Sequence, residues 1–305
     1  MPVSDKKFRS GIVAIIGRPN VGKSTLLNTI IGEKVTIVSA VPQTTRHQIR
    51  GIYSEERGQI VFIDTPGMHR GKDKLDKFMN SASYDTITGA DCIIHLVDSS
   101  KPVGEEEEMV VDCLKDVKVP VILGLNKIDL KGKCIPEYIS LWEKAKGKPI
   151  QKLKFPILFP LSARTSDNVD KLLSILFEHL PLGEPLYPLD HISDTPQKIW
   201  MADIIREKLF HLMREELPHS LTVVIAQLER KRRNVFYVQA EIFVERESQK
   251  EIVIGKKGNI LKKAGSLARQ DLEDFLEGKV FLDLHVRTEA HWRNDELFLK
   301  ETGYM

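Results

Sequence analysis

The first 180 residues alternate short apolar runs with longer amphipathic segments. The apolar runs have the length and the Val, Ile and Leu content of buried strands, and they cover 11–17, 59–67, 91–98, 119–127 and 156–163. The amphipathic segments have the length of helices, and they cover 23–31, 77–87, 105–114 and 169–180. This alternation predicts an α/β domain with a mostly parallel sheet and helices on both faces. The hairpin-like spacing of 49–53 and 59–63 adds one antiparallel edge strand.

The pattern changes after residue 180. The segment 181–196 is rich in proline and has no apolar periodicity, which marks a seam between domains. After it come a helical stripe at 199–217 closed by Pro218, β-like runs at 221–228 and 235–244, a glycine-bounded turn, a helix at 260–276 and a strand at 280–286. This order predicts a second, smaller α+β domain. We therefore expect domains at 1–182 and 197–305, joined by a linker at 183–196.

Composition limits the class of protein without naming a partner. The 305 residues suffice for two domains, and 42% hydrophobic content suffices for a packed core. No apolar stretch is long enough for a membrane span or a signal peptide, so we expect a cytoplasmic protein. The three cysteines lack disulfide or metal spacing. The net charge is only +2, but basic residues gather at 230–233 and 250–269.

A phosphate-loop motif follows the first apolar run. Residues 17–24 read GRPNVGKS, which fits GxxxxGKS at a strand-to-helix junction. Backbone N–H groups of such a loop surround phosphates, Lys23 would reach the terminal phosphates, and the Ser24 hydroxyl would bind Mg²⁺. The other expected nucleotide-binding residues of this segment are Gly17, Asn20, Val21, Gly22 and Thr25.

Two further segments point to the γ-phosphate. At the end of a predicted strand, DTPG places Asp64 where it could hold Mg²⁺ and Gly67 where its N–H could approach the phosphate. In PQTTRHQI, Thr44 and Thr45 are candidates for the residue that closes over Mg²⁺ and the γ-phosphate, and we favour Thr45. The expected catalytic residues are Lys23, Thr45 and Gly67. The expected Mg²⁺ ligands are Ser24, Thr45 and Asp64.

The motifs NKID and SAR indicate the base. Asp129 would accept hydrogen bonds from N1 and N2 of guanine, which opposes an ATP-using enzyme. Asn126 and Lys127 would brace the base-binding loop. Ser162 and Ala163 would complete it, with the Ala163 N–H meeting the guanine carbonyl. The four motifs in this order predict a P-loop NTPase of the Ras-like GTPase class that binds GTP or GDP with Mg²⁺.

A GxxG loop in the second domain indicates an RNA site. Gly255, Lys256, Lys257 and Gly258 lie between an apolar run and a helix, and in a KH fold this loop clamps about four nucleotides. Lys262 and Lys263 then begin the helix and acidic residues end it, which opposes the helix dipole and suits a phosphate backbone at the helix start.

These motifs together resemble the Era family of bacterial GTPases over nearly the whole chain. The resemblance lies in the segments GRPNVGKSTLLN, PQTTRHQI, DTPGMH, NKID, SAR and IGKKG. The resemblance implies a type II KH domain and a GTP-hydrolysing switch that binds the 3′ region of small-subunit ribosomal RNA and assists small-subunit assembly. It also implies membrane association in some members. DNA is not an expected partner. The alternative is a regulatory GTPase whose C-terminal domain binds a protein.

The hydrolytic machinery departs from Ras-like switches. Met68 stands where those proteins carry a water-orienting glutamine, so intrinsic hydrolysis should be slow. Asn20 resembles an asparagine of related GTPases that coordinates K⁺ beside the phosphates, which makes K⁺ a possible further cofactor. The other interpretation is that Asn20 only shapes the turn.

Overall fold

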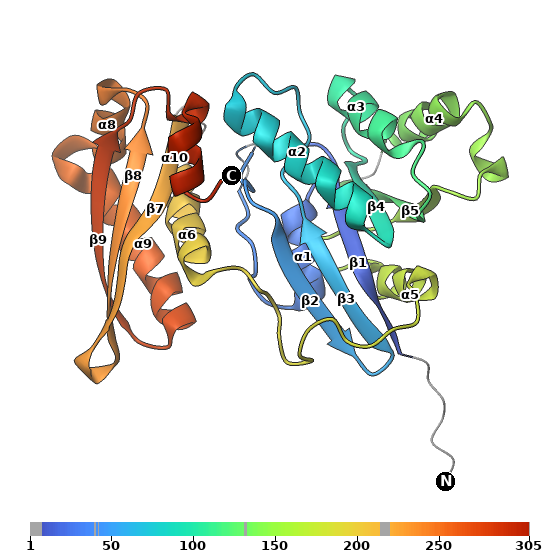
Figure 1. Cartoon of the computed structure of the whole chain (residues 1–305). Coiled ribbons are helices and arrows are strands. Elements are labelled where there is room, and N and C mark those ends of the chain that lie inside the picture. The colour runs from blue at the N-terminus through green and yellow to red at the C-terminus, as the bar shows by residue number, and fades with distance from the viewer. Residues whose placement is uncertain (1–7, 40, 42, 131–132, 214–219, 305) are drawn as a thin grey trace, which may run out of the picture. The chain divides into compact units, whose positions relative to one another are not determined.

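The computed structural model describes residues 8–39, 41, 43–130, 133–213 and 220–304. They form two compact units, shown in Figure 1. The first comprises the described parts of Met1–Thr36, Thr45–Lys72 and Asp76–Asp194. The second comprises those of Ile37–Thr44, Asp73–Leu75 and Thr195–Met305. Two short segments from the early part of the chain therefore belong to the second unit, which linear sequence patterns do not indicate.

The first unit is built on a six-stranded sheet in the order β2-β3-β1-β4-β5-β6. Its strands are β1 (Arg9–Ile16), β2 (Ile49–Glu55), β3 (Gly58–Asp64), β4 (Cys92–Asp98), β5 (Val121–Asn126) and β6 (Ile157–Pro160). Only edge strand β2 is antiparallel to its neighbour; the other pairings are parallel. The mostly parallel sheet and its antiparallel edge, both predicted from apolar spacing, are confirmed.

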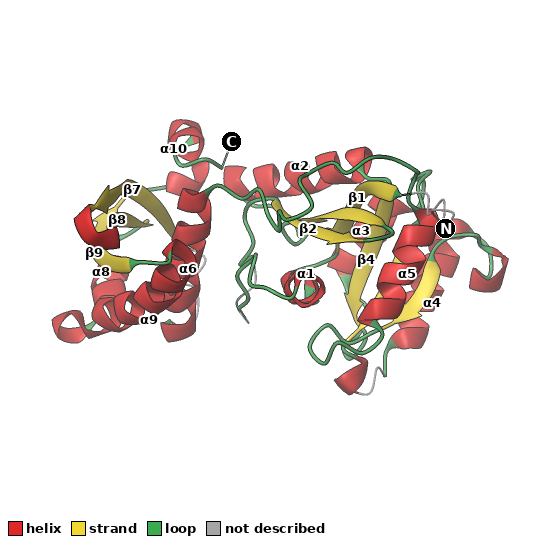
Figure 2. Ribbon diagram, turned by 90° about the horizontal axis from the view of Figure 1, so that it is seen from below, coloured by secondary structure: helices red, strands yellow, loops and turns green. Residues whose placement is uncertain are grey.

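Helices cover both faces of this sheet, as Figure 2 shows. They are α1 (Lys23–Ile31), α2 (Lys74–Gly89), α3 (Glu105–Leu114), α4 (Ile135–Lys146) and α5 (Val169–His179), with short 3₁₀ turns η1 (Ile128–Leu130) and η2 (Ile150–Lys152). One face packs against α1 and α5, and the other against α3 and α4. Helix α4 was missed from sequence because its buried stripe is narrow, with only Tyr138 and Trp142 fully buried.

Most of the proline-rich segment is held along the first unit. The buried side chain of Gln59 accepts from the N–H groups of Leu186 and Tyr187 at 2.7 and 2.9 Å and donates to the Tyr187 carbonyl. Ile52 N donates to Ile192 O at 2.8 Å. Because proline lacks an N–H, such a segment is fixed through its carbonyls and the few amides between its prolines. The domain limits given above stay a prediction.

In its described residues from Gln197 to Thr288, the second unit has the order αββααβ. It contains α6 (Gln197–Leu212), β7 (Leu221–Lys231), β8 (Val235–Val244), α8 (Glu247–Ile254), α9 (Asn259–Leu276) and β9 (Lys279–Thr288), with η3 (Arg232–Asn234) and η4 (Lys256–Gly258) as turns. A terminal part adds η5 (Trp292–Asn294) and α10 (Glu296–Glu301). β7 and β8 are antiparallel, and β8 and β9 are parallel. Helices α6 and α9 bury their apolar stripes on one face of the sheet.

Two sequence expectations for this unit need correction. The first helix ends at Leu212, where Met213 is already extended, rather than at residue 217; Pro218 lies outside the described residues. The second is the missed helix α8. Its sequence ESQKEIVI ends in three apolar β-formers, which indicate an apolar run, but the segment is a helix in which the Gln249 side chain caps the Arg246 N–H and Val253 lies in the core. The remaining strands and the long helix lie where predicted.

Candidate functional site

The phosphate loop connects β1 to α1 at the carboxyl edge of the sheet. Gly22 caps α1 with φ 104°, and a Cβ there would lie 2.5 Å from the side-chain nitrogen of Asn126. Only glycine fits this left-handed, closely approached position. Asn20 is also left-handed, with φ 63°, and its side chain is exposed. The N-terminus of α1 therefore opens onto the loop, an arrangement that suits an anion.

Lys23 supplies the charge of this anion site. Its side chain is buried, and Nζ donates to the carbonyls of Gly17 and Arg18, both at 3.0 Å. Burial lowers the pKa of Lys23, although Asp64 acts in the opposite direction. An ammonium group held across the loop in this way can contact the terminal phosphates of a nucleotide.

The three predicted Mg²⁺ ligands come together. The Ser24 hydroxyl donates to Asp64 Oδ2 at 2.7 Å and lies 3.0 Å from Thr45 Oγ1, which is 3.5 Å from the same carboxylate oxygen. Asp64 is fully buried, and its Oδ1 has no hydrogen-bond partner among the described residues. Burial raises the pKa of Asp64 to about 6, despite Lys23 and the two hydroxyls. A buried carboxylate with two hydroxyls and a spare oxygen fits a hard divalent cation.

Thr44 is separated from this cluster although it precedes Thr45. Its carbonyl accepts from Arg206 Nη2 on α6 at 2.7 Å, and its hydroxyl donates to the Val41 carbonyl at 2.6 Å. Both contacts lie within the second unit. The structure thus places Thr45, the favoured residue, beside Ser24 and Asp64, and it places Thr44 elsewhere.

The segment after Asp64 returns to the phosphate loop. A Cβ on Gly67 would lie 2.6 Å from the Pro19 nitrogen, and Met68 N donates to Gly17 O at 3.3 Å. The Met68 side chain is fully buried in the apolar core, so it cannot orient water. The buried His69 follows, with Nδ1 2.8 Å from the Gly67 carbonyl.

Asn126 joins the phosphate loop to the SAR loop. Its Nδ2 donates to the Val21 carbonyl at 2.7 Å, and its Oδ1 accepts from Ala163 N at 2.9 Å. This bracing role matches the sequence interpretation. In this structure the Ala163 N–H is directed to Asn126, so its expected contact with guanine stays a prediction. Thr25, in the first turn of α1, is partly exposed.

The residues expected to bind the base lie at and after the end of β5. Asp129 is exposed in η1 and accepts from the buried Ser162 hydroxyl at 2.7 Å through Oδ1. Lys127 Nζ donates to the Asn20 carbonyl at 2.9 Å and pairs with Asp98 Oδ2 at 2.8 Å. The Lys127 side chain therefore spans from the NKID motif to the phosphate loop, while Asp129 keeps one carboxylate oxygen for a base.

Asp98 is a site residue that sequence reasoning missed. Burial acts to raise its pKa, but the hydrogen bonds from Lys127 and Ser100 outweigh it and hold the pKa of Asp98 below its ordinary value. The signal was present, because Asp98 ends a buried strand just as Asp64 does. Parallel strands end at one edge of a sheet, so both carboxylates reach the site.

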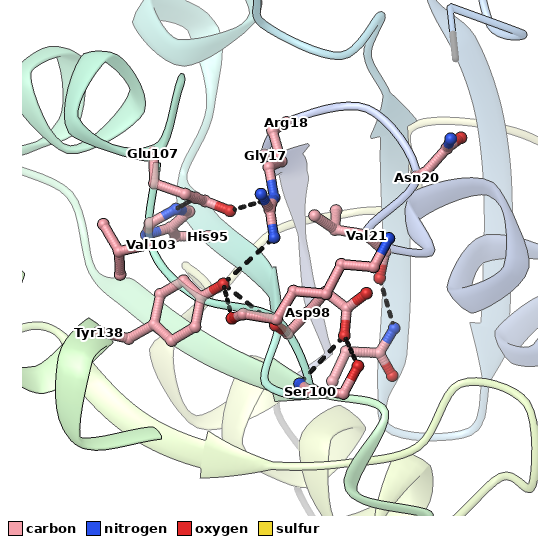
Figure 3. Close-up of polar contacts among 12 residues, drawn as sticks. Gly17, Arg18, Asn20, Val21, His95, Asp98, Ser100, Val103, Glu107 and Tyr138 are labelled. Carbon is pink, nitrogen blue, oxygen red and sulfur yellow. Dashed lines mark hydrogen bonds and ion pairs between the residues drawn. The ribbon is translucent and has the colours of Figure 1, made fainter. Parts of the chain in front are cut away.

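A second missed group lies behind the phosphate loop, and Figure 3 shows it in close-up. The fully buried Glu107 on α3 lies 2.8 Å from Arg18 Nε and 3.4 Å from His95 Nε2. Trp142 Nε1 donates to His95 Nδ1 at 3.2 Å, which places the histidine proton on Nε2, facing Glu107. Neither carboxylate oxygen is aligned for a hydrogen bond, so charge attraction dominates the contact with Arg18. The network fixes Arg18, which no motif singled out.

The GxxG loop of the second unit lies between α8 and α9. Gly255 has φ 72° and Gly258 has φ 75°, both left-handed, and Lys257 between them has φ 54°. A Cβ on Gly255 would lie 2.7 Å from Asn259 Oδ1 and Ile260 Cγ1. The loop is therefore a tight turn that exposes backbone at the start of α9.

Four exposed lysines surround this turn. They are Lys256, Lys257, Lys262 and Lys263. Within the described parts of the chain, no carboxylate forms an ion pair with any of them. The first turn of α9 contains no acidic residue, so the positive end of the helix dipole adds to the lysine charges. The arrangement can bind phosphates.

Comparison with known proteins relates both sites to one family. Residues 12–127 match a family model described as 50S ribosome-binding GTPase, and residues 216–293 match one described as KH domain. GTPase Era of Geobacter sp. (strain M21) is 45% identical over 304 residues, covering 99% of this chain and 100% of the relative. GTPase Era of Halothermothrix orenii is 43% identical over 298 residues, covering 97% and 99%.

Two solved structures are similar over almost the same length. One is Era of Aquifex aeolicus, in a variant bound to GDP.AlF4-, and the other is Era in complex with MgGDPNP and nucleotides 1506-1542 of 16S ribosomal RNA. Each has a TM-score of 0.90 and 36% identity, and each match covers 97% of this chain and 99% of the other. The guanine-nucleotide motifs, the αββααβ unit with its GxxG loop and these full-length relatives agree: the chain belongs to the Era family of GTPases.

Proposed function

We propose that this chain is a GTP-hydrolysing switch that binds the 3′ region of small-subunit ribosomal RNA and assists processing of that RNA and assembly of the small subunit. The observation that carries the RNA part is the GxxG turn with its four exposed lysines, which lack carboxylate partners among the described residues. The related Era that was crystallised with nucleotides 1506-1542 of 16S ribosomal RNA supports the choice of RNA.

The side chains and backbone of this chain act on GTP by positioning its phosphates and by stabilising their negative charge. Lys23 contacts the terminal phosphates, Thr45 closes over the γ-phosphate, and the Gly67 N–H donates to it. Ser24, Thr45 and Asp64 would hold Mg²⁺, which would neutralise charge that develops on the phosphate oxygens. Because Met68 is buried and apolar, no side chain at that position orients the attacking water. Intrinsic turnover is therefore slow.

The backbone offers a route from nucleotide to RNA. Residues 37–44 belong to the second unit, while Thr45 lies with Ser24 and Asp64 in the first. A change in the position of Thr45 on GTP binding or hydrolysis is passed along the chain to Thr44, which Arg206 holds. The nucleotide state thereby biases how the second unit engages RNA.

Cytoplasmic location, with peripheral attachment to the membrane face, completes the proposal. None of the helices in the described parts of the chain has the length and apolar character that a bilayer crossing requires.

The test is RNA binding by the purified full-length chain in the presence of GTP analogue and of GDP. The probe is an RNA fragment of the small-subunit 3′ region, compared with a scrambled RNA and with DNA of the same sequence. We expect preference for the native RNA and steep weakening as salt rises, because phosphate contacts release counterions. No preference over the scrambled RNA would reject the proposal. Weak salt dependence together with capture of a protein would favour the alternative, a regulatory GTPase with a protein partner.

A further inference from the structure

The hairpin between β7 and β8 carries a basic cluster that the GxxG site does not use. Its residues Arg230, Lys231, Arg232 and Arg233 are consecutive and exposed. Among the described residues, no carboxylate forms an ion pair with any of these four. Four adjacent like charges without counter-charges cost free energy through mutual repulsion, and a polyanion removes that cost.

An exposed aromatic ring and a half-buried one lie beside this cluster on the open face of the sheet. Phe281 on β9 is 62% exposed, and its ring stacks on Tyr237 of β8 with centroids 5.8 Å apart and planes 17° from parallel. Lys231 Nζ lies 4.8 Å from the Tyr237 ring centroid. Helices α6 and α9 cover the opposite face of the sheet. An accessible aromatic surface edged by cations is the combination on which single-stranded bases stack.

The carboxylates of the open face interact with neighbouring side chains. Glu229, which lies opposite Tyr237 in the strand pairing, is exposed and accepts from Gln227 Nε2 at 2.7 Å. Glu241 is paired with Arg287 at 2.7 Å, and Asp283 accepts from the Tyr237 hydroxyl at 3.0 Å and lies 3.1 Å from His285. The hollow of about 410 Å³ beside the hairpin is lined by the acidic Glu273 and Asp274 and by the basic Arg233 and Lys279, so its charges balance. The stacked aromatic pair lies on the open face, which is therefore the path for the bases of an RNA.

The hairpin lies too far from the GxxG loop to contact the same nucleotides. The GxxG loop precedes α9, whereas Asn234 of the hairpin donates to the Glu277 carbonyl at the other end of that helix, at 2.6 Å. The 18 residues of α9 span about 27 Å at 1.5 Å each. Figure 1 shows α8 and the hairpin turn at opposite ends of the sheet. Four stacked nucleotides cover only about 14 Å at 3.4 Å each.

We propose that the hairpin Arg230–Arg233 and the Tyr237–Phe281 pair form a second RNA-binding surface, which holds a single-stranded segment of the same RNA outside the four nucleotides clamped by the GxxG loop. The proposal rests on the RNA-binding function above and adds where further nucleotides bind. Its consequence is that affinity depends on RNA length.

The test compares two RNAs, one of five nucleotides that fits the GxxG clamp alone and one of about 20 nucleotides. The hairpin variant is Arg232→Gln with Arg233→Asn, since asparagine tolerates the left-handed φ of 62° at that position. We expect this variant to bind the long RNA about tenfold more weakly, with a salt slope reduced by about 1.4, and to bind the short RNA like the native chain.

The aromatic part is tested by Phe281→Ala, with the control Leu297→Ala on α10. Leu297 is 67% exposed, so the control removes a similarly accessible apolar side chain elsewhere on the unit. We expect about a tenfold loss for the long RNA with Phe281→Ala only. Lys300→Gln is the matching control for charge. Unchanged GTP turnover and thermal midpoint show that each variant is folded.

The outcomes separate this inference from the proposed function. If the native chain binds both RNAs and the hairpin variants bind the long RNA equally well, the second surface does not exist. Equal weakening for short and long RNA would also overturn it, because the hairpin would then act on the GxxG clamp. If the native chain binds neither RNA, the proposed function itself fails.

Discussion

At the scale of single residues, Asp64 shows how burial prepares a site for a metal ion. Its carboxylate lies at the end of β3 and is shielded from solvent. One of its oxygens has no hydrogen-bond partner among the described residues. An acid whose pKa is raised on folding binds protons more tightly in the native state, so its contribution to stability falls as pH rises from about 4 to about 6. At neutral pH the charged group costs stability until a cation binds.

The first prediction concerns Mg²⁺ and pH. Mg²⁺-dependent binding of GTP should weaken as pH falls through about 6, by up to tenfold per pH unit, because the proton and the cation compete for Asp64. Titrations of Mg²⁺ at fixed GTP analogue between pH 5 and 8 measure this. In EDTA at pH 7.5, Asp64→Asn should raise the thermal midpoint. A pH profile that Asp64→Asn leaves unaltered would assign the titration to another group.

We expect selection of the base to depend on the Asp129 carboxylate. Asp129→Asn should shift preference from guanine to xanthine nucleotides, because the carboxylate only accepts hydrogen bonds, whereas the asparagine NH2 group can donate to the C2 carbonyl that xanthine has in place of the guanine amino group. Competition binding of GTP and xanthosine triphosphate measures the ratio, with about a hundredfold change expected from one hydrogen-bonded pair. Ser162→Ala is the control, because it removes the 2.7 Å hydrogen bond from Ser162 to Asp129 but leaves the Asp129 carboxylate in place. Retained guanine preference in Asp129→Asn would place the base elsewhere.

Asn20 is the residue that would coordinate a monovalent cation such as K⁺ beside the phosphates of GTP. Its left-handed, exposed position beside the phosphate loop suits a carbonyl oxygen directed at a cation. GTP turnover should be several-fold faster in KCl than in NaCl, and Asn20→Ala should remove the difference. Equal rates of the native chain in both salts would leave Asn20 with a role in shaping the turn only.

At the scale of elements, helix α3 restrains the phosphate loop through one buried charge. Glu107 faces Arg18 across 2.8 Å, with both groups largely removed from water. Removing one partner of a buried ion pair leaves the other unpaired, which typically costs about 3 to 5 kcal/mol. The loop that binds phosphate is thus fixed by a helix that contributes no ligand.

Glu107→Gln should therefore lower both stability and GTP affinity. We expect a loss of about 3 kcal/mol in unfolding free energy and a weaker nucleotide complex, because Arg18 then loses its counter-charge. Chemical denaturation and nucleotide titration are the measurements. Glu108→Gln, an exposed neighbour on the same helix, is the matched control. If both variants behave alike, α3 does not position the loop.

At the scale of the whole molecule, damage to the RNA site should leave nucleotide binding by the RNA-free chain intact. Gly258→Asp places a carboxylate at an open position of the GxxG turn, where a Cβ meets no atom within 4 Å. RNA affinity should fall at least tenfold through repulsion of phosphate, while GTP affinity stays unchanged. Gly258→Asn has the same shape and tolerates the φ of 75° equally, so it should keep most RNA binding. Equal loss in both variants would indicate a backbone effect instead of charge.

The sequence by itself determined much of this protein. Apolar runs between helical segments gave the parallel sheet, because strands buried on both faces must be continuously apolar. The motifs predicted Lys23, Ser24 and Asp64 as phosphate and Mg²⁺ contacts, because these ligands accept few residue types at these spacings, and the structure places Ser24 and Asp64 within hydrogen-bond distance. Helices α4 and α8 are not predicted from the sequence, because each has too few buried positions for a periodic apolar pattern.

Only the tertiary structure decided which distant groups meet. It separated Thr45 from its neighbour Thr44, assigned residues 37–44 to the second unit, and brought Glu107 to Arg18 across 89 positions. It also set the basic hairpin apart from the GxxG loop by the length of α9. The physical reason is that local patterns report burial and turn geometry, whereas these pairings depend on long-range packing that places one strand end, helix or loop against another.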